Sequence, residues 1–373
     1  MTPVGVQFLV NAGPGSAAGE RAERIARMVD GDAIVTYRKG TRRADAVAMA
    51  REVARNAPEV VYAMDLAVAP VAAWALDGGR RRLIVDTGDA PLAFLELVGA
   101  SATRRVMARA LESVGYGRSD LVIVRGRYHA EQLHAAGHHH VSVVADGVDL
   151  DLLQPKEVTD LRTQLGLDRR MTVGVQGNFT WYPKLGGGLG WDLVQAIGRH
   201  DLDIDAVFIG EGPGLAQLRL MAERLGVGDR VHMMGRVAYS QLATYLSLCD
   251  VTLLTQTDDP SSWARTTGKL PTYLATGRYV VATRVGTAVD LLEPEHLLDY
   301  RGHWDTTYPD RLARKLGELA HDRDRTIARG LALRSLAESF DYDRIARSCA
   351  SEIARVCERS AGSPARLTLG AGL

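Results

Sequence analysis

The chain has 373 residues, which exceeds one typical domain and fits two domains that can each bury a core. Its 45 basic and 45 acidic residues give a formal net charge of zero, which excludes a global field favouring nucleic acid or an anionic membrane. The three cysteines lack metal-ligand spacing, and no apolar run reaches the about 20 residues of a membrane span. We therefore expect a cytoplasmic protein without a signal peptide, in which any anion site is local.

The first 150 residues alternate β-branched runs with alanine-rich helical stretches. This alternation predicts a parallel sheet with helices on both of its faces. Strands are predicted at 4–11, 33–38, 60–65, 82–87, 121–126 and 141–146, and helices at 17–29, 43–56 and 102–115.

A second series of the same kind follows a segment rich in turn, proline and charge signals, and a nearly continuous helical tail ends the chain. We predict two tandem Rossmann-like domains that face a cleft. The first is 1–152, with 340–360 packing back on it, and the second is 171–339, after a linker at 153–170. Strands of the second are predicted at 172–179, 205–212, 231–237, 250–257 and 279–286, with helices at 214–225 and 240–248.

A glycine-rich turn follows the first predicted strand, at the edge where parallel sheets bind ligands. Gly13, Gly15 and Ala18 match G-x-G-x-x-A, which presents backbone amides to a phosphate or a sugar hydroxyl. An NAD enzyme needs an acidic residue at the end of the second strand, whereas this chain has Arg38, which suits NADP. A tight turn without any cofactor is the alternative.

Acid/base candidates follow later strands of the same half. Asp86 and Asp89 come after the fourth strand, where carboxylates can accept hydrogen bonds from sugar hydroxyls or move protons. Alternatively, Asp89 caps the next helix. His129 is a candidate base after the fifth strand, or a surface histidine at a helix start. The histidines at 138–140 precede a strand, at the end opposite the expected cleft, so we predict no metal site there.

Two of only five lysines fall where an anion would be expected. Lys184 lies in a glycine-bounded loop, and Lys269 follows Arg265 at a helix start near Thr267. Because the positive end of a helix dipole repels cations, this placement predicts a bound anion, with solvated surface cations as the alternative. Glycines also mark the ends of two further predicted strands. These are Gly210, Gly212 and Gly214 near the end of one strand, and Gly235 with Arg236 near the end of the next.

These features, in this order, resemble the GT-B glycosyltransferases, in particular the glycogen-synthase and bacterial mannosyltransferase-like branch, the glycosyltransferase family 4-like group. The N-terminal half is similar only in layout. The resembling stretches, all within 141–290, are VVADGVDLDLLQP, GNFTWYPK, FIGEGPGLAQLRLMAERLGVGDRVHMMGRV and GKLPTYLATGRYVVATRVG.

The resemblance implies a nucleotide-sugar whose diphosphate contacts Lys184, Lys269 and Arg265. It also implies a retaining transfer without a metal, to a small molecule such as a natural-product core or to a sugar. Two positions depart from the family pattern. Asn178 replaces an arginine that contacts phosphate, and Thr272 replaces a glutamate that binds the ribose hydroxyls.

The expected partners are thus a nucleotide-sugar donor and a small-molecule or saccharide acceptor, with no nucleic acid and no cofactor; a homodimer is left open. A catalytically silent GT-B paralogue acting as a partner subunit, and an NADP-dependent oxidoreductase, are the alternatives. The predicted catalytic residues are Asp86, Asp89 and His129. The predicted donor-binding residues are Gly13, Gly15, Asn178, Lys184, Gly210, Glu211, Gly235, Arg236, Arg265, Thr267, Lys269 and Thr272.

Overall fold

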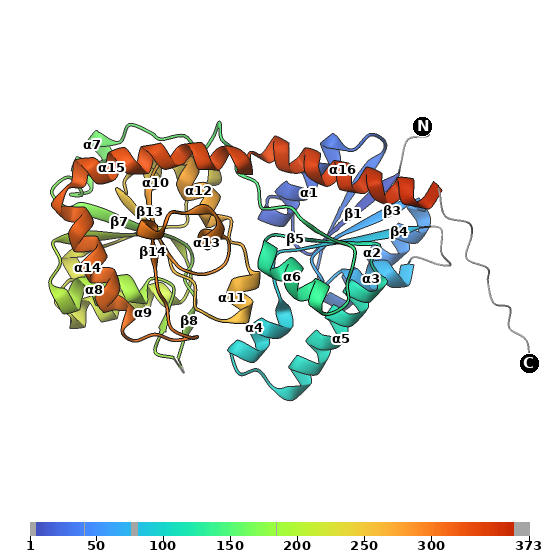
Figure 1. The fold of residues 1–373 in the computed structure, drawn as a ribbon, viewed down its shortest axis with the longest axis horizontal. Coiled ribbons are helices and arrows are strands. Elements are labelled where there is room, and N and C mark those ends of the chain that lie inside the picture. Colours follow the sequence, from blue (N-terminus) through green and yellow to red (C-terminus); the bar gives the residue numbers. More distant parts are fainter. Residues whose placement is uncertain (1–4, 41, 76–80, 184, 362–373) are drawn as a thin grey trace, which may run out of the picture. The chain divides into compact units, whose positions relative to one another are not determined.

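The computed structural model describes residues 5–40, 42–75, 81–183 and 185–361. The chain divides into two compact units, each with one six-stranded parallel sheet between layers of helices (Figure 1). The predicted α/β class with two Rossmann-like domains is therefore confirmed. Unit 1 comprises Met1–Arg125, Ala130–Val144 and Asp343–Leu373, and unit 2 comprises Gly126–His129 and Ala145–Tyr342.

The sheet of unit 1 has the strand order β2-β1-β3-β4-β5-β6. Strands β1, β3 and β5 are buried over their whole length because helices cover both faces of the sheet. After β1, the chain adds β2 on one side of β1 and then β3 on its other side. The topological switch therefore lies between β1 and β3. The strands are β1 Val6–Val10, β2 Ala33–Tyr37, β3 Val60–Met64, β4 Arg82–Thr87, β5 Leu121–Val124 and β6 Val141–Val143.

The helices of unit 1 start and pack as their sequences suggest. Ser16 caps α1, since its Oγ accepts from the backbone N–H of Gly19 at 3.1 Å. Helices α2, α3, α5 and α6 contribute apolar side chains to a common core with the strands. The helices are α1 Ala17–Met28, α2 Arg42–Asn56, α3 Ala69–Ala75, α4 Pro91–Leu97 and α5 Ala102–Arg118, with α6 Arg127–Ala135 and α16 Tyr342–Ala361, whose first residues are assigned to unit 2.

The sheet of unit 2 has the strand order β11-β10-β7-β12-β13-β14, the order of a Rossmann fold. Its switch point lies between β7 and β12. Alternate residues of β10 enter two separate cores: Phe208 packs toward α8, α9 and α14, and Val207 toward α10 and α12. The strands are β7 Met171–Asn178, β10 Ile204–Glu211, β11 Val231–Gly235, β12 Val251–Leu254, β13 Tyr279–Thr283 and β14 Leu297–Leu298, with a small hairpin of β8 Trp181–Tyr182 and β9 Gly187–Gly188.

The helices of unit 2 are mostly short, and several connecting segments are 3-10 helices. Within the described residues, every helix lacks either the length or the apolar content to cross a membrane. The helices are α7 Thr159–Gln164, α8 Trp191–His200, α9 Gly214–Arg224, α10 Leu242–Ser247, α11 Pro260–Ala264, α12 Lys269–Ala275, α13 Thr287–Leu291, α14 Tyr308–His321 and α15 Arg323–Ala332.

The segment 145–170 differs from the predicted domain end at residue 152 and linker at 153–170. It belongs to unit 2, because Val148, Leu153 and Leu167 are buried in a core of that unit. The backbone N–H of Val148 also donates to the carbonyl of Phe340 at 2.8 Å. Charged residues between these apolar positions gave the segment its linker-like composition.

Candidate functional site

The carboxyl end of β7 lies at the switch point of unit 2, where open α/β sheets bind ligands. Gly177, the second-last residue of β7, has φ +153, and a Cβ built on it would lie 3.0 Å from the Nζ atom of Lys269. The ammonium therefore lies beside Gly177, in space that a side chain would fill.

Glycines bring the end of β10 against the end of β7. Gly210 is the direct neighbour of Gly177 in the sheet, and a Cβ on Gly210 would overlap the carbonyl oxygen of Gly177. A Cβ on Gly212 would overlap the carbonyl oxygen of Phe179. The glycine-rich sequences of these two strand ends thus permit close backbone packing beside Lys269.

Helix α12 is fixed to the end of β7 along one face. Lys269 is its first residue, and the backbone N–H of Lys269 donates to the Oγ1 of Thr267 at 3.1 Å. One turn later, the hydroxyl of Tyr273 accepts from the backbone N–H of Gln176 at 2.9 Å. Residues four apart share a helix face, so the tyrosine contact also sets the position of the lysine.

The charge of Lys269 is poorly compensated. Its side chain is half-buried, and this burial, together with the nearby positive charge of Arg265, lowers the pKa of Lys269 to about 8. No carboxylate in the described part of the chain forms an ion pair with it. The exposed Arg265 lies just before α12, where the Gln256 side chain donates to the Arg265 carbonyl at 3.1 Å. A bound anion would stabilise both cations.

Thr272 does not offer a free hydroxyl at the predicted ribose position. Its side chain is buried, and its Oγ1 donates to the carbonyl oxygen of Gly268, one turn earlier in α12, at 2.7 Å. The threonine therefore completes the hydrogen bonding of its own helix.

The other predicted residues of the second half lie at neighbouring strand ends. Asn178 ends β7 and pairs in register with Glu211, which ends β10. Glu211 accepts from Arg236 at 3.0 Å in an exposed ion pair, and Gly235 ends the adjacent strand β11. The predicted Lys184 lies outside the described residues.

In unit 1, Asp86 is buried rather than open to a sugar. Its carboxylate accepts from Arg21 at 3.0 Å, from Tyr62 at 2.6 Å and from Arg125. Burial alone would raise the pKa of Asp86, but Arg125 and Arg21 outweigh it and lower that pKa. This placement argues against a catalytic role, because the carboxylate already holds together three elements of the unit.

The two other predicted catalytic residues differ in accessibility. Asp89 is exposed in the loop after β4. The N-cap position of α4 is Ala90, and in the first turn of that helix the Leu92 N–H donates to Glu112 at 2.8 Å. His129 lies in the first turn of α6 and is only 3% exposed, so the alternative of a surface histidine is wrong.

Two polar residues at the switch point of unit 1 escaped the sequence analysis. Asn11 follows β1 and Asp65 follows β3, and the Asn11 amide donates to the Asp65 carboxylate at 3.2 Å. The predicted Gly13 and Gly15 lie beside them in an exposed turn. Both polar residues are the last residue of a predicted strand, and that signal becomes specific only when the strand order is known.

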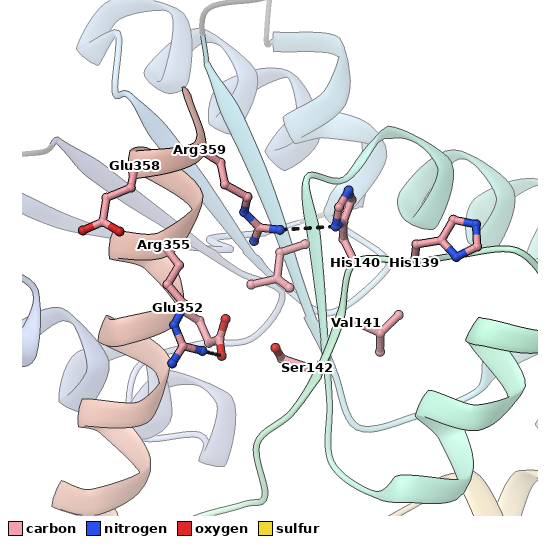
Figure 2. Close-up of a pocket in the computed structure, with 9 residues that line it drawn as sticks. His139, His140, Val141, Ser142, Glu352, Arg355, Glu358 and Arg359 are labelled. Atoms are coloured by element: carbon pink, nitrogen blue, oxygen red, sulfur yellow. Dashed lines mark hydrogen bonds and ion pairs between the residues drawn. The ribbon is translucent and has the colours of Figure 1, made fainter. Parts of the chain in front are cut away.

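A cavity of 380 Å³ lies between β6 and α16, both in unit 1 (Figure 2). Arg359 contacts His140 Nδ1 at 3.2 Å, and Arg355 contacts Glu352 at 2.7 Å. The cavity lies at the amino ends of β5 and β6, away from the loops that carry the predicted site. Among the described residues, no group of three or more His, Cys, Asp or Glu side chains is arranged to hold a metal ion.

Comparison with known proteins identifies relatives of this architecture. Residues 174–322 match the family model for glycosyl transferases group 1, whereas a comparison with curated protein sequences finds no match. Anabaena HepE, solved with UDP and glucose, is 20% identical with a TM-score of 0.73, covering 94% of this chain and 99% of that chain. Sucrose-phosphate synthase from Thermosynechococcus elongatus is 16% identical with a TM-score of 0.77, covering 95% and 100%. The lipopolysaccharide outer core galactosyltransferase WaaB, in its apo form, is 13% identical with a TM-score of 0.62, covering 94% and 99%.

At these identities the solved structures establish the fold. The family match covers the strand ends of unit 2 with Gly177 and Gly210, and the start of α12 with Lys269. It confirms the predicted resemblance and the predicted class of enzyme, a nucleotide-sugar-dependent glycosyltransferase. The chain therefore has the GT-B fold, and its residues 174–322 match the model of the glycosyl transferases group 1 family.

Proposed function

We propose that the protein transfers a sugar from a nucleotide-sugar to a small-molecule or saccharide acceptor, with the donor diphosphate at the switch point of unit 2. The observation that carries this proposal is the half-buried ammonium of Lys269, which rests against Gly177 without a carboxylate partner among the described residues. That ammonium lies within the segment that matches the glycosyl transferases group 1 family. The UDP and glucose bound to HepE support this type of donor.

The chemistry of such a transfer explains the need for cations. The bond between the anomeric carbon and the diphosphate oxygen breaks, while the acceptor oxygen bonds to that carbon and loses its proton. Negative charge grows on the departing nucleoside diphosphate, and the neighbouring cations Lys269 and Arg265 would stabilise it. Fixed cations can supply this stabilisation, which supports a metal-independent transfer. Retention of the anomeric configuration is proposed from the family resemblance alone.

A panel of nucleoside diphosphates tests the proposal. We expect one of UDP, GDP, ADP and dTDP at millimolar concentration to raise the melting temperature, because ligand bound to the native state stabilises it. Lys269→Met should weaken that binding by about tenfold, since a charge-assisted contact is lost. Lys315→Met is the matched control, because Lys315 is also largely buried but pairs with Glu318 on α14.

Two results would overturn the assignment of this site. One is the absence of any shift or calorimetric heat with all four nucleotides. The other is equal affinity in the Lys269→Met variant. Binding without hydrolysis or transfer of any matching nucleotide-sugar would instead identify a catalytically silent GT-B paralogue.

A further inference from the structure

Arg38, at the carboxyl end of β2, is a cation that the donor site does not use. It is half-buried, and its Nη1 donates to the Oδ1 of Asn11 at 3.2 Å. No ion pair joins it to a carboxylate within the described parts of the chain. By contrast, Arg21 and Arg82 of the same unit pair with aspartates at 3.0 and 2.9 Å. Arg38 therefore keeps an uncompensated positive charge beside a neutral amide.

Asn11 is held in place by a strained aspartate. Its Nδ2 donates to Asp65 Oδ2 at 3.2 Å, and the Asp65 Oδ1 accepts from the backbone N–H of Ala67 at 3.3 Å. Asp65 has φ +96, a conformation that non-glycine residues rarely adopt and that is concentrated at functional sites. The chain of contacts from Arg38 through Asn11 to Asp65 follows the ends of β2, β1 and β3, across the switch point of unit 1.

The adjoining turn leaves room for a ligand. Gly13 and Gly15 are exposed, and a Cβ built on either would meet no heavy atom within 4 Å. Ligands of open parallel sheets bind at this edge and at this switch point. The cation, the amide and the carboxylate thus line an accessible part of the sheet edge.

We infer that Arg38 binds the anionic group of the acceptor, a carboxylate or a phosphate on a hydroxyl-bearing molecule. This inference rests on the proposed function, because it assigns the acceptor of that transfer. The order of charges orients the ligand. Its anionic group lies at Arg38, and its hydroxyls donate toward Asp65, which would repel an anion.

Matched sugars test the assignment by calorimetry, in the presence of the nucleoside diphosphate that binds. We expect glucuronate or glucose 6-phosphate to bind at least about tenfold more tightly than glucose, since a charge-assisted contact is worth about that factor. The comparison of the two anions distinguishes a carboxylate from a phosphate. Arg38→Gln should abolish the preference, and Arg38→Lys should restore part of it because the charge returns.

Arg27→Gln is the control for general charge effects. Arg27 lies on α1 in the same unit, its side chain is 68% exposed and it pairs with Glu23 at 3.8 Å, so its loss should leave the preference intact. Equal binding of the anionic and neutral sugars, or an anion preference that survives in Arg38→Gln, would overturn the inference. So would NADPH binding that disappears in Arg38→Gln, because the arginine would then serve a dinucleotide phosphate. Nucleoside diphosphate binding, measured separately, reports whether the donor site itself is correct.

Discussion

The ammonium of Lys269 lies beside Gly177, because a Cβ built on Gly177 would lie 3.0 Å from Nζ. The lysine begins α12 and the glycine lies at the end of β7, so the contact joins a helix start to the switch point of the sheet. A side chain at position 177 would occupy the space of the ammonium. The proposed diphosphate site therefore depends on a glycine as much as on a cation.

Substitution of Gly177 by alanine tests this dependence. The new methyl would lie 2.8 Å from Leu189 and 3.0 Å from Lys269, in a backbone conformation with φ +153. We expect Gly177→Ala to lower the free energy of unfolding by about 1–3 kcal/mol and to weaken nucleoside diphosphate binding by about tenfold. Gly226→Ala is the control, because Gly226 has φ +73 but open space around it, so alanine there introduces strain alone. Unchanged nucleotide affinity in Gly177→Ala would contradict the prediction.

The pKa of Lys269 predicts a pH dependence of binding. Burial and Arg265 lower this pKa from 10.5 to about 8 in the folded protein. Between these values the unfolded chain holds the proton and the folded chain does not, so the lysine's contribution to stability rises with pH across that window. A bound diphosphate favours the charged ammonium and raises the pKa again. Nucleotide binding should therefore take up protons at a pH of about 8.5.

Calorimetry in two buffers of different ionisation enthalpy measures that uptake. Wild type and Lys315→Met should take up protons on binding, whereas Lys269→Met should not. Absence of uptake in the wild-type protein would show that the diphosphate does not contact Lys269.

Most strands of the two large sheets were predictable from sequence because they are apolar runs rich in β-branched residues, but their order was not. Pairing depends on contacts between distant residues, and the two sheets differ in it. Strand β1 lies between β2 and β3, whereas β7 lies between β10 and β12. The two-residue strand β14 is too short to give a periodic signal.

The candidate site was likewise predictable only where its signal is local in sequence. The charge pattern at Lys269 indicated an anion, because the conflict between a cation and a helix start is local in sequence. The role of Asp86 depends on Arg21, which lies 65 residues away, and on Arg125, which lies 39 residues away. The sequence therefore placed Asp86 correctly at a strand end without revealing its buried partners.

Removal of the Asp86 charge should lower the free energy of unfolding. Asp86→Asn leaves the guanidiniums of Arg21 and Arg125 buried without their counter-charge, so we expect the free energy of unfolding to fall by about 3–5 kcal/mol near neutral pH. Asp203→Asn is the control, because that aspartate is 83% exposed and pairs with Arg170 at the surface. Urea unfolding measures both variants.

The stability of wild type and of Asp86→Asn can also be compared as a function of pH. The folded pKa of Asp86 is lowered below 3.8, so its stabilising contribution is fully present above that value and is lost as the pH falls through the folded pKa. The difference between wild type and Asp86→Asn should therefore be constant at neutral pH and shrink in acid. A variant with full stability but no transfer activity would instead support the catalytic role predicted from sequence.

Thr272 tests how far the family pattern holds at the ribose position. Because its hydroxyl already donates to the Gly268 carbonyl, Thr272→Val should lower the free energy of unfolding by about 0.5–1.5 kcal/mol and leave nucleotide affinity nearly unchanged. Thr272→Ser retains the hydroxyl and should preserve more of the stability. Thermal unfolding and calorimetry with the bound nucleotide separate the two effects. The opposite result would be a Thr272→Val variant that keeps its stability and loses about tenfold in nucleotide affinity. The wild-type hydroxyl would then have to leave the Gly268 carbonyl and contact the ribose. In that case the threonine would replace the family's glutamate as a ligand.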